Sequence, residues 1–508
     1  MLRARCEVRQ TTGLREPELV ERLGDVDALV VRSETKVTAK VLDAAPRLAV
    51  VGRAGVGVDN IDVPAATARG VYVVNAPLGN IVAAAEHAIT LALAVMRRVV
   101  DADRSIRAGE WTRSKFIGNE LRGKTLGLVG IGRVGTEVAR RAAVFGMTIV
   151  AHDPFATEAS ARAAGARLVE LDELLRTADV VSVHVPLTEK TRGLMGEASL
   201  AKMKKSAIVV NTSRGEVVDL PALADALAGG RLSGAGLDVF PQEPLPADSP
   251  VRGAPRTVLT PHIAGSTVEA QTNVAVDVVE QILDVLDGKP ARFAVNAPRP
   301  PAEEAGGPAW IRCGERLGSL VAQLLDERPA RLDITYAGSL LELDAEPLRA
   351  AVVKGLLETF SEQRVNLVNA LAVARSRGLD ISERREADAQ RYNALLTVAV
   401  GKTEVGGTLV QGEPRVVFID GFWVDVPVEG HLLLTKHQDK PGLVGRVGTL
   451  LGEHDVNISS MQVGRLHPRG EALMILTLDD DVPDAVRAKI RSFADITAVR
   501  TARLGNID

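Results

Sequence analysis

Residues 125–135, TLGLVGIGRVG, decide the fold of this chain of 508 residues. The apolar run 125–129 leads into the spacing G-x-G-x-x-G, which Gly130, Gly132 and Gly135 form at the start of a helical stretch. A strand, a glycine turn and a helix in this order are typical of dinucleotide binding. The glycines let the backbone approach a pyrophosphate, and the helix N-terminus meets its charge. A glycine-rich turn that binds nothing is the alternative.

The next apolar run after this motif ends in Asp153, 18 residues beyond Gly135. A carboxylate at this distance can bind both ribose hydroxyls of NAD, and its charge would repel the 2′-phosphate of NADP. An aspartate that only caps the turn before Pro154 is the alternative. We therefore predict a dinucleotide site that takes NAD as cofactor in preference to NADP.

Eight more short apolar runs lie between about residues 25 and 265: DALVVRSE, LAVVGRAG, VYVVNAP, MTIVAHDP, VVSVHVPL, AIVVNTSRG, GAGLDVF and VLTPHIAG. Each is apolar almost throughout instead of alternating, is flanked by Gly, Pro or Asn, and is separated from the next by helical stretches. This pattern is typical of parallel strands that are buried on both faces and joined by crossover helices. The predicted fold class is α/β with a doubly wound sheet, followed by one long amphipathic helix at 267–288.

The composition excludes several classes of protein. Apolar residues make up 46% of the chain and the formal net charge is −4, which argues against a nucleic-acid partner because such proteins carry a basic excess. No signal peptide and no apolar run of about 20 residues is present, so no membrane association is expected. Cys6 and Cys313 stand alone, without a Cys/His cluster, which predicts no metal site, no disulfide framework and a cytoplasmic location.

Proline density marks a change of domain after the long helix. Five prolines lie between residues 290 and 308, which places a boundary near 297–309. The segment 310–428 mixes helices with strand-like runs such as RVVFIDGFWVDV and has no catalytic cluster. The last eighty residues have the order βαββαβ, which predicts a separate unit with a four-stranded sheet and helices on one face.

Three strand ends supply the groups that hydride transfer from a 2-hydroxy acid requires. Arg214 in NTSRGEVVD can bind a carboxylate, His262 in LTPHIAGS can take the hydroxyl proton, and Glu243 in LDVFPQEP can hold that base. In open α/β sheets, ligands bind at the carboxyl ends of strands, where all three residues are expected. Taken singly, each could be an ordinary surface residue.

The chain resembles the D-isomer-specific 2-hydroxyacid dehydrogenase family. The matching stretches are VRSETKV, VVGRAGVGVDNID, NAPLGN, AAAEHA, GLVGIGRVG, VNTSRGEVVD, LDVFPQEP and TPHIAGST. The resemblance implies a flavodoxin-like substrate-binding domain in two parts, 1–77 and 265–297, around a Rossmann-type NAD domain, 78–264. An intervening domain, 298–428, and a regulatory ACT domain, 429–508, would follow.

The resemblance also implies the activity and the site residues. The expected reaction is the NAD-dependent oxidation of D-3-phosphoglycerate, the first step of L-serine biosynthesis. Arg214, Glu243 and His262 would be catalytic. The cofactor would contact Val56, Gly130, Gly132, Arg133, Val134, Gly135, Asp153, Val185, Thr212, Ser213, Arg214, Asp238, His262, Ile263, Ala264 and Gly265, with Asp238 on the nicotinamide carboxamide. The substrate would contact Arg32, Arg53, Gly55, Asn75 and Asn80.

Regulation and assembly are expected by the same matching. His437, Asp439 and Asn457 correspond to positions where ACT domains bind L-serine, and an ACT domain without a ligand is the alternative. Trp111 and Arg113 match a motif that reaches a neighbouring subunit, and the family implies a homotetramer. Two rival functions stay open: a reductase of glyoxylate or 2-oxoglutarate, and a noncatalytic NAD-sensing protein. Reduction of 2-oxoglutarate to 2-hydroxyglutarate is also expected as a second activity.

One departure from the family concerns the N-terminus. The family's first strand and helix precede the stretch that matches RARCEVRQTTG, whereas this sequence begins directly at that expected second strand. In a sheet of order 2-1-3-4-5 the preceding strand would be central. Either the start codon lies upstream of the present Met1 or another segment fills the gap, and the first of these is the hypothesis.

Overall fold

The computed structural model describes residues 1–299, 301–302, 306–361 and 364–505. The chain divides into two compact units. One comprises Met1–Arg53, Val58–Asn75 and Val279–Asp508, and the other comprises Ala54–Gly57 and Ala76–Val278. Of the predicted boundary at 297–309, residues 300 and 303–305 lie outside the described residues.

The second unit is built on a parallel sheet of seven strands in the order β10-β9-β8-β7-β4-β5-β6. The strands are β4 (Thr125–Val129), β5 (Thr148–His152), β6 (Arg167–Leu168), β7 (Val180–Val183), β8 (Ile208–Asn211), β9 (Gly234–Leu237) and β10 (Thr257–Leu259). The strand order reverses between β4 and β7, which is the point where α/β sheets of this kind bind ligands. The predicted doubly wound α/β fold is confirmed. Only the two-residue β6 was not predicted, because it is too short to leave an apolar run.

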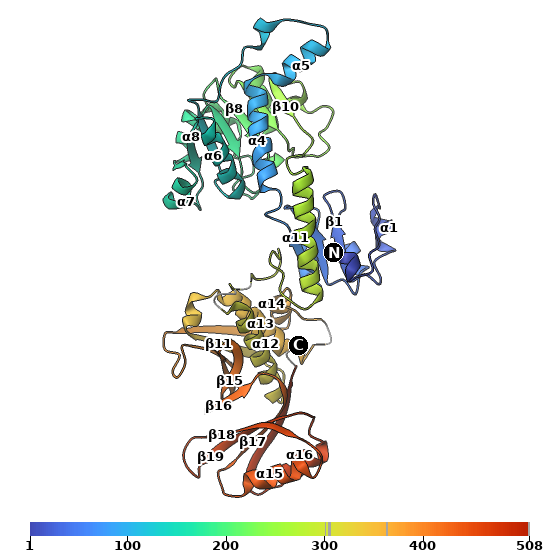
Figure 1. The fold of residues 1–508 in the computed structure, drawn as a ribbon, viewed down its shortest axis with the longest axis vertical. Helices are drawn as coiled ribbons and strands as arrows, with labels where there is room; N and C mark the ends of the chain where they lie inside the picture. Colours follow the sequence, from blue (N-terminus) through green and yellow to red (C-terminus); the bar gives the residue numbers. More distant parts are fainter. Residues whose placement is uncertain (300, 303–305, 362–363, 506–508) are drawn as a thin grey trace. The chain divides into compact units, whose positions relative to one another are not determined.

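Helices cover both faces of this sheet. They are α4 (Ile81–Met96), α6 (Arg133–Val144), α7 (Glu158–Ala163), α8 (Leu171–Thr177), α9 (Glu197–Ala201) and α10 (Leu220–Ala228). Helix α5 (Val99–Arg107) follows α4 and has no buried residue. One face packs under α4 and α6, with Leu91 and Val138 in its core, and the other packs under α8 and α10, with Leu174 and Leu223 (Figure 1). Because both faces are buried, the strands are apolar at every position instead of at alternate ones.

The first unit begins with a three-stranded parallel sheet of β1 (Ala28–Val31), β2 (Val50–Arg53) and β3 (Tyr72–Asn75). It is packed with α1 (Glu16–Val20), α2 (Ala39–Asp43) and α3 (Val63–Ala68) around one apolar cluster. The long helix α11 (Val268–Leu286) agrees with the predicted helix 267–288. Its last residues belong to this unit.

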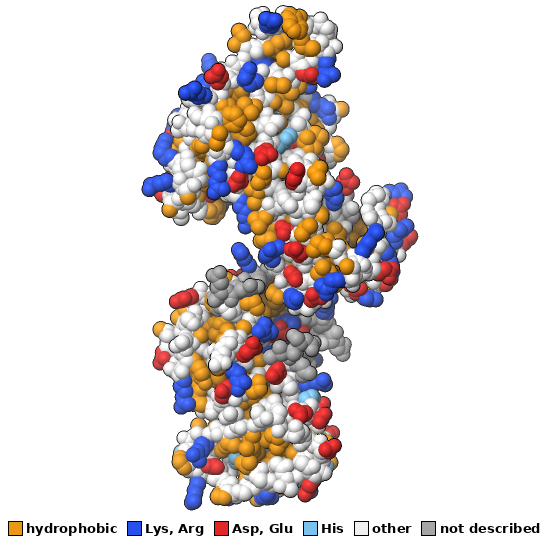
Figure 2. All heavy atoms as spheres, viewed as in Figure 1, with side chains coloured by type: hydrophobic (Ala, Val, Ile, Leu, Met, Phe, Trp, Pro, Cys, Tyr) orange, Lys and Arg blue, Asp and Glu red, His pale blue; other side chains and the backbone are white. Residues whose placement is uncertain are grey.

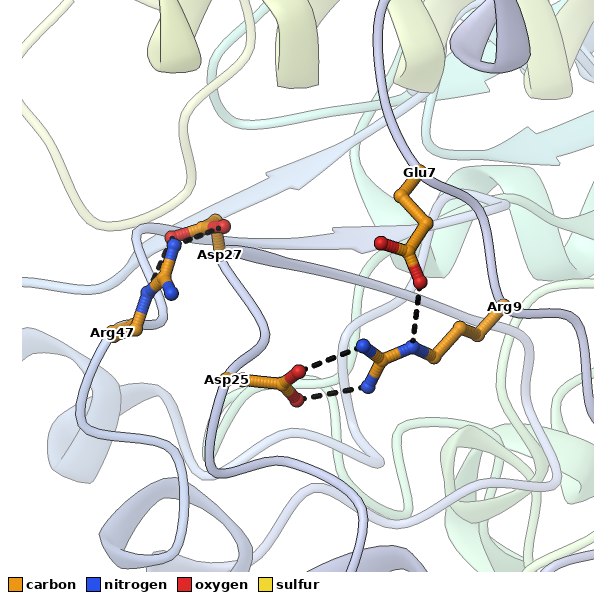
Figure 3. Close-up of polar contacts among 5 residues, drawn as sticks. All are labelled: Glu7, Arg9, Asp25, Asp27 and Arg47. Atoms are coloured by element: carbon orange, nitrogen blue, oxygen red, sulfur yellow. Dashed lines mark hydrogen bonds and ion pairs between the residues drawn. The ribbon is translucent and has the colours of Figure 1, made fainter.

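The strand expected at the start of the chain is not formed. Residues 2–4 form a 3-10 helix, residues 7–10 are irregular, and β1 is the edge of the sheet. A strand needs a hydrogen-bonded neighbour, and residues 7–10 pair with no strand of the described part of the chain. Ion pairs hold the segment instead. Arg9 binds Asp25 through two contacts of 2.7 and 2.9 Å and Glu7 at 3.2 Å, beside an Arg47–Asp27 pair (Figure 3).

The remainder of the first unit contains two further sheets. One has six strands in the order β12-β11-β13-β14-β15-β16 and packs on α12 (Gly307–Leu324) and α13 (Ala345–Glu358), with α14 (Ala370–Ser376) nearby. Its strands are β11 (Arg331–Gly338), β12 (Asp380–Glu386), β13 (Ala394–Val400), β14 (Thr403–Val410), β15 (Glu413–Ile419) and β16 (Phe422–Pro427).

The C-terminal sheet has the predicted βαββαβ order. Its elements are β17 (Gly430–Gln438), α15 (Leu443–Gly452), β18 (Ile458–Arg465), β19 (Glu471–Leu478), α16 (Asp484–Arg491) and β20 (Ile496–Leu504). Helices α15 and α16 cover one face, as predicted (Figure 1). The other face shares an apolar core with α12 and α13, to which Leu432, Leu434 and Ile475 belong.

Candidate active site

The glycine turn between β4 and α6 has the geometry that a pyrophosphate requires. Gly130 has φ 93°, and a Cβ at this residue would lie 2.6 Å from the carbonyl oxygen of His184. A Cβ at Gly135 would lie 2.4 Å from the carbonyl oxygen of Gly130. A Cβ at Gly132 would meet nothing within 4 Å, so the space beside it is open. The first and third glycines therefore allow the tight turn and the close helix packing, and the second leaves room for a ligand.

Asp153 follows β5 and lies at the rim of this turn. Its Oδ2 accepts a hydrogen bond from the backbone N–H of Ile131 at 3.0 Å, and its Oδ1 accepts one from the N–H of Phe155 at 2.9 Å. The aspartate thus caps its own turn and also holds the glycine turn. Each carboxylate oxygen can accept a second hydrogen bond, so capping and ribose binding are compatible.

His184, which the sequence analysis did not single out, lies directly under the glycine turn. Burial lowers the pKa of its imidazole to about 4, and its Nε2 lies 2.8 Å from the Ser182 hydroxyl. A neutral ring at this position adds no charge beneath the turn. The next residue, Val185, also contacts the turn, since its Cγ1 would lie 2.9 Å from a Cβ on Gly130.

The remaining residues predicted for the cofactor lie at the ends of the same strands. Arg133 and Val134 begin α6, with Arg133 exposed. Ser213 follows β8, and its N–H and hydroxyl both donate to the side-chain oxygen of Asn211. The Thr212 hydroxyl oxygen is buried and has no hydrogen-bond partner among the described residues. An open glycine, a carboxylate at the end of the neighbouring strand and an unsatisfied hydroxyl fit a dinucleotide, so these residues are suited to hold NAD.

Glu243 and His262 form a hydrogen-bonded pair at the ends of β9 and β10. The two side chains meet at 2.8 Å between His262 Nδ1 and Glu243 Oε2, and about half of the imidazole is exposed. The other carboxylate oxygen, Oε1, accepts a hydrogen bond from the N–H of Phe240 at 3.1 Å. The carboxylate is held from both sides, so it fixes the ring orientation and leaves Nε2 available to exchange a proton with a ligand.

Arg214 follows β8, the strand next to β9. Its Nη1 donates to the carbonyl oxygen of Ser213 at 2.8 Å, and its own carbonyl oxygen accepts from the Asn211 side chain at 2.9 Å. Gly215 lies against the loop that carries Glu243, since a Cβ there would be 1.9 Å from the carbonyl carbon of Phe240. The structure therefore brings the Arg214 and Glu243 loops into direct contact at the carboxyl edge of the sheet.

Asp238 holds the loop that carries His262. Its side chain is fully buried, and it accepts hydrogen bonds from the Thr260 hydroxyl at 2.5 Å and from the N–H groups of Ile263 and Ala264 at 2.9 and 2.8 Å. Burial alone would raise the pKa of Asp238, but His87, Thr260 and the two backbone donors together lower it. His262 has φ 55°, a left-handed conformation that costs about 1 kcal/mol and needs such surroundings.

Three residues predicted for the substrate lie at one edge of the three-stranded sheet. Arg53 and Asn75 are register partners at the ends of β2 and β3, and Val31, the last residue of β1, pairs with Arg53. Arg32 follows Val31 and is exposed, and its carbonyl oxygen accepts from the Asn60 side chain at 2.9 Å. Two cations and an amide thus gather where neighbouring parallel strands end.

The other predicted contacts belong to the second unit. Asn80 begins α4, and its side-chain nitrogen lies 2.9 Å from where a Cβ on Gly265 would be. Asn80 is therefore next to the loop of His262. The carbonyl oxygen of Gly55 accepts from the N–H of Ala76 at 2.9 Å, which ties Val56 and its neighbours to this unit.

The three residues predicted to bind serine are not brought together within one chain. His437 and Asp439 lie at the end of β17, where Gln438 pairs with Glu471. His437 is buried, and Asp439 accepts from the N–H of Arg469, which is the main cause of its lowered pKa. Asn457 precedes β18 and donates to Asp479 at 2.6 Å, at the opposite end of the sheet.

Comparisons with known proteins agree with this geometry. Residues 89–264 match the model of the D-isomer specific 2-hydroxyacid dehydrogenase, NAD binding domain. Residues 308–420 match the D-3-phosphoglycerate dehydrogenase intervening domain, and residues 431–495 match the ACT domain. A putative D-isomer specific 2-hydroxyacid dehydrogenase from Polaromonas sp. has a similar fold, with a TM-score of 0.54 and 31% identity over 58% of this chain and 94% of its own. The fold and the site thus define an NAD-dependent oxidoreductase.

Two curated relatives are similar over nearly their whole length. D-3-phosphoglycerate dehydrogenase from Synechocystis sp. is 44% identical over 99% of this chain and 92% of its own. D-3-phosphoglycerate dehydrogenase from Archaeoglobus fulgidus is 44% identical over 93% of this chain and 91% of its own. The chain belongs to the D-3-phosphoglycerate dehydrogenase family. Among the described residues, no helix combines the length and the apolar character needed to cross a membrane.

Proposed function

We propose that this protein oxidises D-3-phosphoglycerate to 3-phosphohydroxypyruvate with NAD, the first step of L-serine biosynthesis. The observation that carries the proposal is the Glu243–His262 pair at 2.8 Å, beside the Arg214 loop on the carboxyl edge of an NAD-binding sheet. Oxidation of a 2-hydroxy acid needs an acid/base group that takes the hydroxyl proton, and this pair can supply it. The similarity to D-3-phosphoglycerate dehydrogenases supports 3-phosphoglycerate as the acid.

Each catalytic side chain has a distinct task in this proposal. His262 takes the hydroxyl proton of the substrate on Nε2, because its Nδ1 is bound to Glu243. Glu243 stabilises the imidazolium that results and returns the ring to the same orientation in the reverse reaction. Arg214 binds the substrate carboxylate through its planar guanidinium. The glycine turn and Asp153 would hold NAD, which would supply the hydride acceptor.

Arg32 and Arg53 are proposed to bind the substrate phosphate. They lie at the ends of neighbouring strands, and a phosphate with two negative charges favours two guanidinium groups over one. Asn75, the register partner of Arg53, supplies a neutral amide at the same edge. Replacing Arg53 by lysine would keep the charge and remove the forked geometry, so we expect a higher KM for 3-phosphoglycerate.

L-Serine is the proposed allosteric effector. Asp439 and Asn457 lie at opposite ends of the C-terminal sheet, so a site that uses both takes one of them from a second copy of the chain. A homo-oligomer is therefore part of this proposal, and a tetramer is the state implied by the family. Around α5 the surface carries apolar side chains, including Val99, Ile106 and Trp111, which is 73% exposed (Figure 2). Such a patch is suited to a subunit contact.

The test is NADH formation from 3-phosphoglycerate by the full-length protein, with and without millimolar L-serine. Glyoxylate and 2-oxoglutarate, assayed with NADH in the reverse direction, are the comparison substrates. We expect 3-phosphoglycerate to have the highest kcat/KM, and His262→Ala to lower kcat by roughly 10²- to 10⁴-fold while NADH affinity stays near that of the wild type. Absence of NADH formation from 3-phosphoglycerate would exclude the proposed reaction, and unchanged rates and Tm in serine would exclude the effector.

A further inference from the structure

Helix α4 faces β9 through a ladder of three contacts. Val95 Cγ1 would lie 2.6 Å from a Cβ on Gly234, and Leu91 Cβ would lie 2.9 Å from a Cβ on Gly236. The residue one turn before Leu91 is His87, and the residue two positions after Gly236 is Asp238. Four residues of a helix rise about 6 Å and two residues of a strand rise about 6.6 Å. A contact every fourth residue of α4 can therefore match a contact every second residue of the strand. Because Gly234 and Gly236 have no side chains, α4 approaches β9 closely, and His87 can then form a hydrogen bond at the third contact.

That third contact joins His87 to the carboxylate of Asp238 and to Thr260. His87 Nε2 lies 3.0 Å from the Thr260 hydroxyl oxygen and 3.3 Å from Asp238 Oδ1. The Thr260 hydroxyl has one proton, and it donates this proton to Asp238 at 2.5 Å. The hydroxyl oxygen must then accept from His87, so Nε2 carries a proton. His87 is 16% exposed and Asp238 is fully buried, so water competes little for these bonds.

We propose that His87 is a positioning residue for the loop Thr260–Ala264, which carries the acid/base residue His262. His87 connects a long helix to the carboxylate that binds the Ile263 and Ala264 N–H groups on one side of the loop. Asp238 also holds His262 through its backbone, because its carbonyl oxygen accepts from the N–H of His262 at 2.8 Å. The left-handed conformation of His262 is thereby anchored to α4 without contact between His87 and the substrate.

The experiment compares His87→Leu, which fills the space without a donor, with His87→Gln, whose amide nitrogen restores one. Thr90→Ala is the control on the same helix, since Thr90 is exposed and its hydroxyl donates only to the carbonyl oxygen of Glu86 within the described part of the chain. Two measurements are made. Steady-state kinetics gives kcat and KM for NAD, and hydrogen exchange is followed at the Ile263 and Ala264 amides in the protein without ligands. The exchange measurement does not depend on activity.

We expect His87→Leu to lower kcat roughly tenfold and to speed up hydrogen exchange of the Ile263 and Ala264 amides roughly tenfold, with KM for NAD changed little. His87→Gln should restore most of the kcat and most of the protection from exchange. Thr260→Val, which removes the hydroxyl, should reproduce the effect, and the double variant should lose little more than either single one. Equal effects of Leu and Gln, or wild-type exchange and kcat in His87→Leu, would overturn the proposal.

The inference rests on the proposed role of His262, and the two can fail separately. If His87→Leu accelerated the amide exchange but left kcat unchanged, we would conclude that His87 holds the loop and that His262 does not take part in the reaction. A wild-type protein without activity on any hydroxy acid would refute the proposed function, while the exchange data would still decide whether His87 holds the loop.

Discussion

Gly215 is the glycine at the carboxyl edge of the large sheet where an added Cβ would have the closest neighbour. It is the first residue of a short 3-10 helix (Gly215–Val217) directly after Arg214, and it is buried. A Cβ there would lie 1.9 Å from the carbonyl carbon of Phe240 and 2.3 Å from both its oxygen and the nitrogen of Pro241. All three atoms are backbone, so no side-chain rotation can relieve the contact.

The magnitude follows from these distances. Ordinary contacts of a Cβ begin at 3.4 Å, so Gly215→Ala requires a displacement of 3.4 − 1.9 = 1.5 Å between the Arg214 and Glu243 loops. A misplacement of about 1 Å in a catalytic constellation costs about 10²-fold in rate, and overpacking of a buried site costs about 1–3 kcal/mol of stability. We therefore expect Gly215→Ala to lower kcat/KM for 3-phosphoglycerate by at least 10²-fold, with a measurable fall in Tm.

The assay is initial-rate NADH formation on protein that has passed a thermal unfolding check. Gly253→Ala is the matched control, because a Cβ at Gly253 meets nothing within 4 Å. This control should keep both kcat/KM and Tm. If Gly215→Ala retained wild-type kcat/KM, the contact between the two loops would not position the catalytic groups, and the reasoning from close packing to catalysis would be refuted.

Three further outcomes are expected. Asp153→Asn removes the charge that disfavours a 2′-phosphate, and the ratio of kcat/KM with NADP to that with NAD should rise roughly tenfold; an unchanged ratio would show that selectivity arises elsewhere. Thr212→Val should weaken NAD binding in a titration without lowering the Tm of the ligand-free protein, because the hydroxyl has no partner among the described residues; a lower Tm and unchanged affinity would contradict this. The pKa of His184 is lowered to about 4, so the unfolded chain binds a proton that the folded chain does not as the pH falls from 6.5 toward 4. The free energy of unfolding should therefore decline over this range by at most about 3 kcal/mol from this group, and His184→Gln should flatten the decline in denaturant titrations at several pH values.

Helices and strands could be predicted from the sequence wherever a local pattern of apolar residues can arise from only one kind of structure. Strands buried on both faces must be apolar throughout, and all nine predicted strands of the first 265 residues are present. The strand at the N-terminus was expected from the family resemblance and not from an apolar run, and it is not formed. The far face of the C-terminal sheet packs on the core of α12 and α13, and its apolar pattern alone does not specify this neighbour.

The site divides in the same way. The residue types and their places after strands made Gly130, Asp153 and His262 candidates, because phosphate approach, ribose binding and proton transfer each require a particular chemical group. The motif AAAEHA, which contains His87, is visible in the sequence. The role of His87 depends on its contact with Asp238, which lies 151 residues further along the chain. No spacing along the chain encodes that contact.

The sequence by itself determined which chemical groups stand at the ends of the strands and that the sheet is parallel. The tertiary structure alone decided that β8, β9 and β10 are neighbours, that Gly215 presses the Arg214 loop against the Glu243 loop, and that α4 reaches the loop of His262. The physical reason is range. Hydrophobic periodicity and turn chemistry act over a few residues, whereas strand order and helix placement are set by the packing of segments that meet only after the whole domain has folded.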